Sequence, residues 1–350
     1  MMQNAMPYDD DDDEDALDHF DDEFDPLEEE PAREPIPVET VIAALRESEA
    51  GDGEANETIY YGLSGLSYED IAVLRPAWNA LDVVFRQHLL NALIEASESV
   101  YDLDYSALGR LSLSDPEVEI RAEAVGLLWD DLSLTFMREL MHMAQHDEGD
   151  AVRAAAVGAL GSFILTGELG DLPLDQTNEA QALATRIYED GDESIEVRRR
   201  ALEALSNSSN SNVNPAIEVA YASDDDRLRI SAVHGMGKSN DQKWVDIVLE
   251  QLDSPDPEMR HEAARAAGEL QIEDAISILG GLIENDDRDI QEGAIWSLGE
   301  IGGSTALRIL TEVLRVAQEE EDESLIETIE EAIASASLSG GSLLTFSLDD

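Results

Sequence analysis

One phrase of the sequence returns at a fixed interval, and this interval constrains the fold more than any other feature. Each copy carries an arginine or glutamine shortly after an acidic segment, and the last four copies are spaced 31 residues apart. Self-similarity with a period of about 20–50 residues is typical of stacked supersecondary units. In successive copies the marker residue is Arg121, Arg153, Arg198, Arg229, Arg260 and Gln291.

The residues after each marker predict an amphipathic helix. Apolar residues stand three, four and seven positions later, as at Ala263, Ala264 and Ala267, and these positions share one helix face. A glycine eight positions after the marker suits a helix end or a tight contact between helices. It recurs as Gly161, Gly237, Gly268 and Gly299.

A second helix is predicted before each acidic turn. Residues 244–252 and 275–283 both have apolar side chains at helical spacing. The aspartates of the turns, such as those at 224–226 and 256, can accept the free N–H groups at the start of the next helix. The repeated unit is therefore helix, acidic turn, helix, and the predicted fold class is all-α.

The segment from Asp150-Ala151-Val152-Arg153 through Ala159-Leu160-Gly161 resembles HEAT repeats, specifically the short bilin-lyase HEAT-like class. The resemblance covers about residues 111–334 and ends in a degenerate copy near Leu325. It implies a right-handed, armadillo-like α-solenoid, a superhelix of stacked antiparallel helix pairs with an open concave face. Such arrays serve many unrelated tasks, so the resemblance predicts the fold and not the function.

The sequence divides into four predicted regions. Residues 1–35 form an acidic tail that is expected to be disordered, and residues 36–110 form a divergent helical N-terminal cap. Residues 111–336 form the repeat array, and residues 337–350 form a C-terminal tail. Two markers, Arg153 and Arg198, are 45 residues apart, and we expect the surplus to be a loop at 166–178.

The acidic tail contains a candidate binding motif. Leu17, Phe20, Phe24 and Leu27 would share one face of a helix, which predicts a segment that becomes ordered on a partner. The alternative is a disordered tail with scattered apolar side chains.

Composition excludes several function classes. The chain has no cysteine, which removes disulfides, thiol catalysts and thiolate zinc sites. Its 80 acidic residues against 21 lysines and arginines give a net charge of −59, so we expect no nucleic-acid binding. A basic partner and simple solubility in a salty cytoplasm both remain open as reasons for this charge. No cationic leader or membrane-length apolar run stands out, and we expect a cytoplasmic protein that binds no membrane.

One helix face is the candidate partner-binding surface. Positions one, two and five after each marker point away from the apolar set, and the resemblance implies that they line the concave surface. In the C-terminal half they hold the densest group of cationic and aromatic side chains, whose arginine forks suit carboxylates. We hypothesise that this stripe docks an acidic, hydrophobic peptide, for which the chain's own N-terminal tail is one candidate; the alternative is a solvated face of mixed charge. The stripe comprises Arg199, Arg200, Glu203, His234, His261, Glu262, Arg265, Glu292 and Trp296.

Two groups invite a metal interpretation that we do not favour. HEAT-like deoxyhypusine hydroxylases carry repeated His-Glu pairs that bind two irons, and here a single pair, His261-Glu262, cannot fill both coordination shells. Glu139, His142 and His146 could hold a divalent ion on one helix face, but a histidine near a helix C-terminus also stabilises the helix dipole. We expect neither a metal nor any other cofactor.

These observations predict a non-enzymatic scaffold that binds a protein or peptide along its concave face. No glycine-rich phosphate loop, nucleophile elbow or zinc-protease helix is present, so no catalytic residue is named. One alternative is a HEAT-like lyase or chaperone-type factor that handles a chromophore or metal cofactor. Another is an acidic assembly factor that masks basic proteins.

Overall fold

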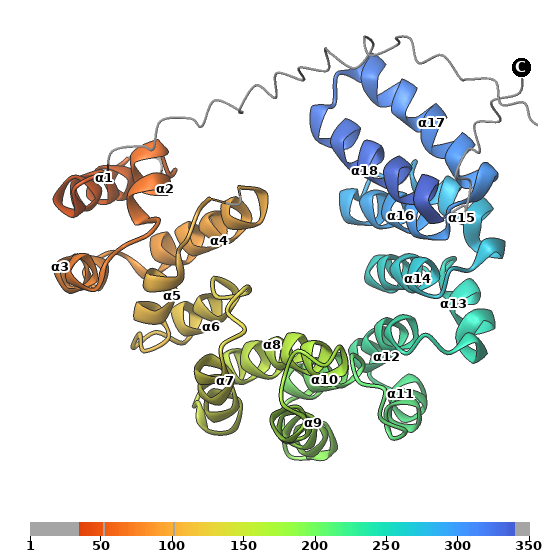
Figure 1. The fold of residues 1–350 in the computed structure, drawn as a ribbon, viewed down its shortest axis with the longest axis horizontal. Helices are drawn as coiled ribbons and strands as arrows, with labels where there is room; N and C mark the ends of the chain where they lie inside the picture. Colours follow the sequence, from red (N-terminus) through yellow and green to blue (C-terminus); the bar gives the residue numbers. More distant parts are fainter. Residues whose placement is uncertain (1–34, 52, 101, 340–350) are drawn as a thin grey trace, which may run out of the picture.

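The computed structural model describes residues 35–51, 53–100 and 102–339, and in these ranges every regular element is a helix. The helices follow one another around a C-shaped arc (Figure 1). The arc starts with α1 (Val38–Ala50), α2 (Glu57–Leu63) and α3 (Tyr68–Trp78). The expected all-α solenoid is confirmed.

An inner row and an outer row of helices alternate along the arc (Figure 1). Successive inner helices pack on one another, and from α6 onward each inner helix also packs on one or two adjacent outer helices. The inner row is α4 (Val83–Ser99), α6 (Val118–Gly126), α8 (Asp150–Glu168), α10 (Ile195–Leu205), α12 (Asp226–Lys238), α14 (Pro257–Glu269), α16 (Arg288–Ile301) and α18 (Glu323–Ser339). The outer row is α5 (Ser106–Ser112), α7 (Leu134–His146), α9 (Leu174–Glu189), α11 (Val213–Tyr221), α13 (Val245–Gln251), α15 (Ile276–Leu282) and α17 (Gly303–Glu320). Two 3-10 turns, Gln242–Trp244 and Glu273–Ala275, lead into α13 and α15.

The apolar set after each marker residue forms the seam between helices, as its spacing predicts. On α12, Ala232, Val233 and Met236 are completely buried, and the equivalent residues of α14 are buried as well. Each fully buried aliphatic side chain stabilises the fold by about 1.5–3 kcal/mol. Most of the stability of the array therefore lies in contacts between neighbouring units.

The recurrent glycine lies where two inner helices approach backbone to backbone. A Cβ added to Gly268 would stand 2.8 Å from the Cα of Ser297, and one added to Gly237 would stand 2.8 Å from the Cα of Ala266. Both glycines are also the next-to-last residues of their helices, so at these two positions the helix-end and the tight-contact interpretations both hold.

The acidic turns act in two ways. Asp225, Asp256 and Asp287 are the N-cap residues of α12, α14 and α16, and their side chains accept backbone N–H groups of the first turn, as expected. Before α6 and α8 the aspartates, Asp115 and Asp147, lie two residues ahead of the N-cap. Their carboxylates accept the backbone N–H of the N-cap residue, and they also pair with arginines of the preceding inner helix.

The marker arginines bind the turn of the next unit in the N-terminal half. Arg121 on α6 pairs with Asp147, and Arg153 on α8 pairs with Glu193 before α10. Arg86 on α4 makes the same kind of pair with Asp115 and is almost fully buried. Further along, Arg229 and Arg260 instead donate to backbone carbonyls of the turn before their own helix.

The surplus residues between Arg153 and Arg198 do not form the expected loop at 166–178. They lengthen α8 to 19 residues and α9 to 16 residues, and only the turn 169–173 separates these helices. The apolar run from Ala159 to Leu165 continues the buried face of α8, which explains why the helix does not end earlier.

Among the described residues, α8 is the one helix that is long and apolar enough to cross a membrane. The sequence did not indicate such a run, because its apolar residues are interrupted by Arg153, by glycines and by Ser162. Within the array, α8 packs against α6, α7, α9 and α10, as a core helix of a soluble solenoid does.

Some sequence predictions fall outside the described residues. They are the tail motif Leu17, Phe20, Phe24 and Leu27, and the segment 340–350. Of the predicted C-terminal tail, residues 337–339 belong to the end of α18.

The buried apolar side chains form two separate clusters. One runs from Val38 to Leu127, and the other runs from Leu113 to Ala336. The two overlap in sequence around α6.

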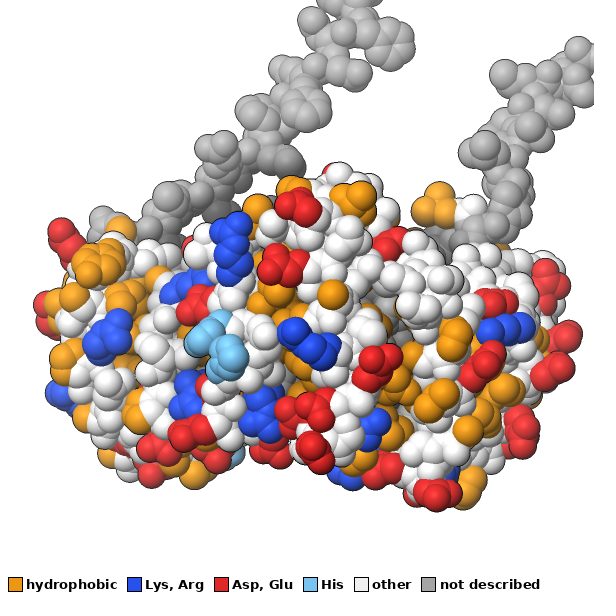
Figure 2. Space-filling model, turned by 90° about the horizontal axis from the view of Figure 1, so that it is seen from below, with side chains coloured by type: hydrophobic (Ala, Val, Ile, Leu, Met, Phe, Trp, Pro, Cys, Tyr) orange, Lys and Arg blue, Asp and Glu red, His pale blue; other side chains and the backbone are white. Residues whose placement is uncertain are grey.

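On the outer face, acidic, basic and hydrophobic side chains are interspersed over the underside of the arc, where α7, α9 and α11 lie (Figure 2). Exposed apolar residues on these helices, such as Leu174 and Val219, do not set this face apart as a binding surface.

Candidate binding groove

The predicted stripe lies on the inner row of helices, and the structure divides it into buried and accessible residues. Arg200, two positions after its marker, is exposed, whereas Arg199, one position after it, is only 8% exposed. The expectation that the whole stripe faces an open groove is therefore wrong for Arg199. The first position points at the next inner helix, because the offset of one residue turns the side chain toward that neighbour.

Arg199 joins three inner helices through carboxylates and a hydroxyl. Its guanidinium donates to Ser231 on α12 at 3.3 Å and to Glu258 on α14 at 3.1 Å. It also lies 3.4 Å from Glu196 and 3.8 Å from Glu203 on its own helix. Its charge is thus shared among three carboxylates, and Arg199 acts as a bridge within the scaffold.

Arg200 is accessible but also paired. Its guanidinium contacts Glu203 at 2.9 Å and Glu196 at 3.2 Å on the same helix. Burial lowers the pKa of Arg200, but the two carboxylates outweigh burial and raise it above its ordinary value. Arg200 therefore stays charged, but Glu196 and Glu203 balance this charge, so that it attracts a ligand only weakly.

The histidines of the stripe also have partners. Nδ1 of His234 lies 3.1 Å from Glu262, and Nδ1 of His261 lies 3.0 Å from the backbone carbonyl of Asp289. Burial raises the pKa of Glu262, but the hydrogen bond with His234 and the nearby charges of His234, His261 and Arg265 outweigh burial and lower it. Glu262 is therefore an ionised carboxylate fixed between neighbouring helices.

The remaining members end the stripe on α16. The guanidinium of Arg265 stacks over the ring of half-buried Trp296 at 4.4 Å from the ring centroid. Glu292 accepts from Arg288 at 2.6 Å. The C-terminal part of the stripe is thus a set of paired side chains that link α10, α12, α14 and α16.

In the N-terminal half, the same helix positions hold small residues and open a pocket. On α8 they are Ala154, Ala155 and Gly158, and on α6 Ala122 and Gly126 take the first and fifth positions. The pocket has a volume of about 490 Å3 and lies across α6, α8 and α10. Its other lining residues are Val125, Leu128, Trp129, Asp131, Phe136, Ala151, Ala159, Ser162, Phe163, Glu196 and Arg200.

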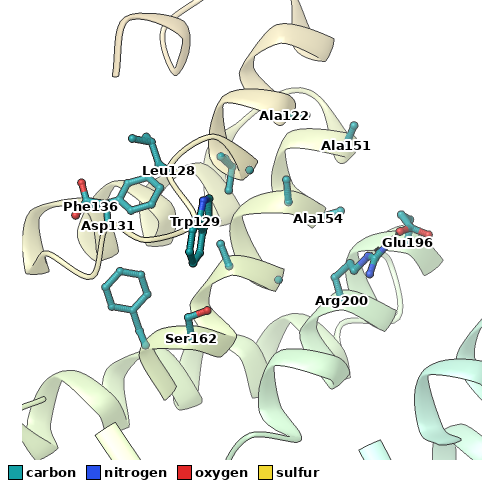
Figure 3. Close-up of a pocket in the computed structure, with 16 residues that line it drawn as sticks. Ala122, Leu128, Trp129, Asp131, Phe136, Ala151, Ala154, Ser162, Glu196 and Arg200 are labelled. Carbon is teal, nitrogen blue, oxygen red and sulfur yellow. Dashed lines mark hydrogen bonds and ion pairs between the residues drawn. The ribbon is translucent and has the colours of Figure 1, made fainter. Parts of the chain in front are cut away.

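Trp129 forms the aromatic wall of this pocket. Its indole stands beside the alanines of α8, and Arg200 and Glu196 lie on the opposite side (Figure 3). The side chain is 52% exposed, and its Nε1–H donates to Ser97 at 3.3 Å. Phe136 and Phe163, in edge-to-face contact, are buried behind it. The pocket therefore combines an apolar floor, one accessible aromatic ring and a charged rim.

The sequence analysis missed Trp129 and the alanine floor because it sought charged and aromatic side chains at the repeat positions. A signal was present: Ala151, Ala155, Gly158 and Ser162 are spaced four, three and four apart, which places small residues along one face of α8. Trp129 lies in the turn after α6, outside the repeat positions, and nothing in its spacing marks it.

The metal interpretations find little support in the geometry. Glu139 pairs with Arg110 at 2.9 Å, and the rings of His142 and His146 contact each other edge to face. His146 lies in the last turn of α7, where a cation favours the helix dipole. Over the part of the chain that the structure describes, no three His, Asp or Glu residues converge as metal ligands would.

The match to a known family falls on the C-terminal part of the array. Residues 245–330, which include α13 to α17, match the sequence model for HEAT repeats. The chain contains HEAT repeats. None of the curated protein sequences matches this chain.

Several solved structures resemble the HEAT array at low sequence identity. The Escherichia coli protein YibA is 18% identical, covers 81% of this chain and 98% of its own, and has a TM-score of 0.41. The CpcE–CpcF complex of phycocyanin lyase from Nostoc is 17% identical, covers 66% and 94%, and has a TM-score of 0.42. Human deoxyhypusine hydroxylase is 15% identical, covers 77% and 96%, and has a TM-score of 0.34. Such scores carry no argument about function, and the fold assignment rests on the helix packing described above.

Proposed function

We propose that this protein is a non-enzymatic scaffold that binds a protein or peptide along the inner row of its helices. The observation that carries this proposal is the pocket beside Trp129. A large aromatic ring is accessible there against a floor of methyl groups, whereas Arg199, Arg200 and His234 further along the same face are paired with carboxylates. Exposed aromatic side chains beside apolar pockets are frequent anchor points in protein interfaces.

The small-residue floor suits a partner helix. Alanine and glycine at Ala151, Ala155 and Gly158 let the backbone of a docked helix approach α8 closely, and a side chain of that helix can enter the pocket. The curved inner row of a solenoid offers such a helix an extended surface on both sides of the anchor.

The acidic peptide hypothesis receives less support from the geometry. Arg199, Arg200 and His234 already have carboxylate partners, so an acidic ligand would have to displace Glu196, Glu203 or Glu262. We therefore place the anchor at the pocket, and we assign the stripe the role of fixing the spacing of α10 to α16.

Peptide display on the immobilised full-length protein tests this function. Peptides enriched from a library should bind in solution and lose at least about tenfold in affinity with Trp129→Ala or Gly158→Leu, which remove the wall or fill the pocket. Tyr68→Ala is the matched control, because Tyr68 is an aromatic residue that is 89% exposed on α3, away from the pocket. Binders that are equally tight for all three variants, or the absence of any binder, would contradict the proposal.

A small-molecule ligand is the second candidate, and the pocket volume favours it. About 490 Å3 lies within the range of about 300–1,000 Å3 that is usual for small-molecule sites. A HEAT-like factor that handles a chromophore or another cofactor would retain it on purification. An absorbance spectrum and mass spectrometry of the purified protein separate the two functions, and only this second one predicts a bound compound that is lost in Trp129→Ala.

A further inference from the structure

Three acidic residues that lie close to lining residues of the pocket along the chain differ from those of the stripe. Glu119 and Glu123 lie on the face of α6 that carries Ala122, and Asp130 follows Trp129. Glu123 accepts a hydrogen bond from the neutral side chain of Gln87 at 3.1 Å, and neither Glu119 nor Asp130 has a cation partner among the described residues. The carboxylates that themselves line the pocket, Asp131 and Glu196, are neutralised by arginines.

Carboxylates without a cation partner therefore stand next to the residues that line the apolar floor. Among the residues that the structure describes, Arg200 is the only basic one that lines the pocket, and its charge is held by Glu196 and Glu203. The net charge of −59 over the whole chain adds a long-range field of the same sign. A ligand that carries positive charge next to an apolar anchor gains from both features.

We infer that the partner presents a basic amphipathic helix, with an aromatic or branched aliphatic side chain that enters the pocket beside Trp129. Its lysines or arginines lie within a turn or two of that anchor, where they meet Glu119, Glu123 and Asp130. This inference rests on the proposed function, and it adds the chemistry of the partner.

Two other occupants have the wrong charge. The chain's own segment 9–34 contains 16 acidic residues and one arginine, so docking it here would place like charges together. A second copy of the chain carries the same net charge of −59. Both are disfavoured electrostatically, and both become outcomes of the test.

The test uses three labelled synthetic peptides of about 18 residues, or five helical turns. All three carry the apolar anchor pattern enriched by display on the full-length protein. Their remaining positions carry lysine in the first, glutamine in the second and glutamate in the third. Affinity is measured by fluorescence anisotropy at low and high salt.

We expect the lysine peptide to bind at least about tenfold more tightly than the glutamine peptide at low salt, and the glutamate peptide to bind more weakly than both. The advantage of lysine should shrink at high salt, because screening weakens attraction between exposed charges. Of the four tryptophans, Trp129 is the exposed one, so its fluorescence should shift to the blue when the lysine peptide binds.

Two triple variants of equal charge separate local recognition from net charge. Glu119→Gln, Glu123→Gln and Asp130→Asn together should remove most of the advantage of the lysine peptide. Asp175→Asn, Glu179→Gln and Glu189→Gln on the outer helix α9 are the matched control, since all three residues are exposed and the net charge changes equally. Equal losses in both triple variants would overturn the inference.

The failures of the two proposals are distinguishable. Peptides that depend on Trp129 but bind equally well with lysine, glutamine or glutamate leave the scaffold function standing and overturn the inference. Peptides that bind equally well to the Trp129→Ala variant overturn both.

If replacing Leu17, Phe20, Phe24 and Leu27 by serine in the full-length chain shifts Trp129 fluorescence without any peptide, the tail is the occupant. A blue shift that depends on protein concentration identifies a second copy. Either of these two results also overturns the inference.

Discussion

Arg121 on α6 donates two parallel hydrogen bonds to Asp147 in the turn before α8, at 2.9 Å from Nε and 2.8 Å from Nη2. Its Nη1 also donates to the carbonyl of Asp115 at 2.8 Å. One marker arginine thus ties its own turn to the turn of the next unit. Because both side chains are about nine-tenths buried, this pair is screened less by water than a surface pair.

Removing one partner of this pair should destabilise the array strongly. Asp147→Ala leaves the Arg121 guanidinium buried without its carboxylate, and we expect the free energy of unfolding in urea to fall by about 3 kcal/mol. The double variant Asp147→Ala with Arg121→Met should regain a large part of that loss, because the unpaired charge is gone. Arg315→Ala is the control, since Arg315 pairs only with exposed Glu312 and Glu319 on α17. A double variant less stable than Asp147→Ala would contradict this account.

The paired carboxylates should make stability fall at acid pH. Burial raises the pKa of Asp147, but hydrogen bonds from Arg121 and from the Gly149 N–H outweigh it and lower the pKa below its ordinary value. The hydrogen bond from Arg153 lowers the pKa of Glu193, against burial. Groups with a lowered folded-state pKa stabilise the fold above their unfolded pKa of about 4, and this stabilisation is lost as pH falls through the folded value.

We therefore expect the urea midpoint to fall as pH decreases below about 5, and to fall less steeply in Asp147→Asn with Glu193→Gln. As pH falls, the net negative charge declines almost equally in the unchanged protein and in the double variant. The difference between their urea midpoints therefore reports on the Asp147 and Glu193 pairs alone. Parallel curves for the two proteins would show that these carboxylates do not titrate with folding.

The seam glycines should tolerate alanine only where the inner helices leave room. Gly268→Ala places a methyl group 2.8 Å from the Cα of Ser297, and we expect a loss of about 1–3 kcal/mol from overpacking. Gly158 is the matched control: its added Cβ meets Arg200 at an ordinary 3.8 Å, and alanine there should stabilise the helix by up to about 1 kcal/mol. Thermal unfolding followed by circular dichroism measures both, and similar effects at the two sites would refute the close approach.

The end of α17 should gain stability from a glycine. Glu321 has φ 59° and ψ 32°, the left-handed conformation that costs most residues about 1–2 kcal/mol. Its carboxylate also lies at the negative end of the helix dipole. Glu321→Gly removes both penalties, and we expect the unfolding free energy to rise by about 1 kcal/mol. Glu321→Gln removes only the charge, so an equal gain in both variants would show that the backbone conformation is not the cause.

The repeat determines most of what could be predicted. Helical spacing after Arg229 and Arg260 predicted the buried seams, and the acidic turns predicted the N-caps at Asp225 and Asp256, because both depend on residues close in sequence. The length of α8 was not predictable in this way. A break in the period shows that residues are added, but packing against α7 and α9 decides whether they extend a helix or form a loop.

The candidate site was predicted only in part. The repeat positions correctly marked the inner face that carries Arg200 and, further back, Ala155 and Gly158. They could not show that Arg199 turns toward α12, because its burial depends on how closely two units pack. Nor could they place Trp129, which reaches the pocket from a turn.

The two apolar clusters that overlap around α6 bear on how the arc moves. In a solenoid each helix leans mainly on its neighbours, so a small rotation at every seam accumulates into a large change in curvature, as in a spring. Such bending is easiest where the hydrophobic interior is interrupted. This interruption lies at α6, the helix that lines one side of the pocket. Bending the arc there would widen or narrow the pocket beside Trp129. The curvature of the whole array would then control how accessible this one aromatic ring is to a ligand.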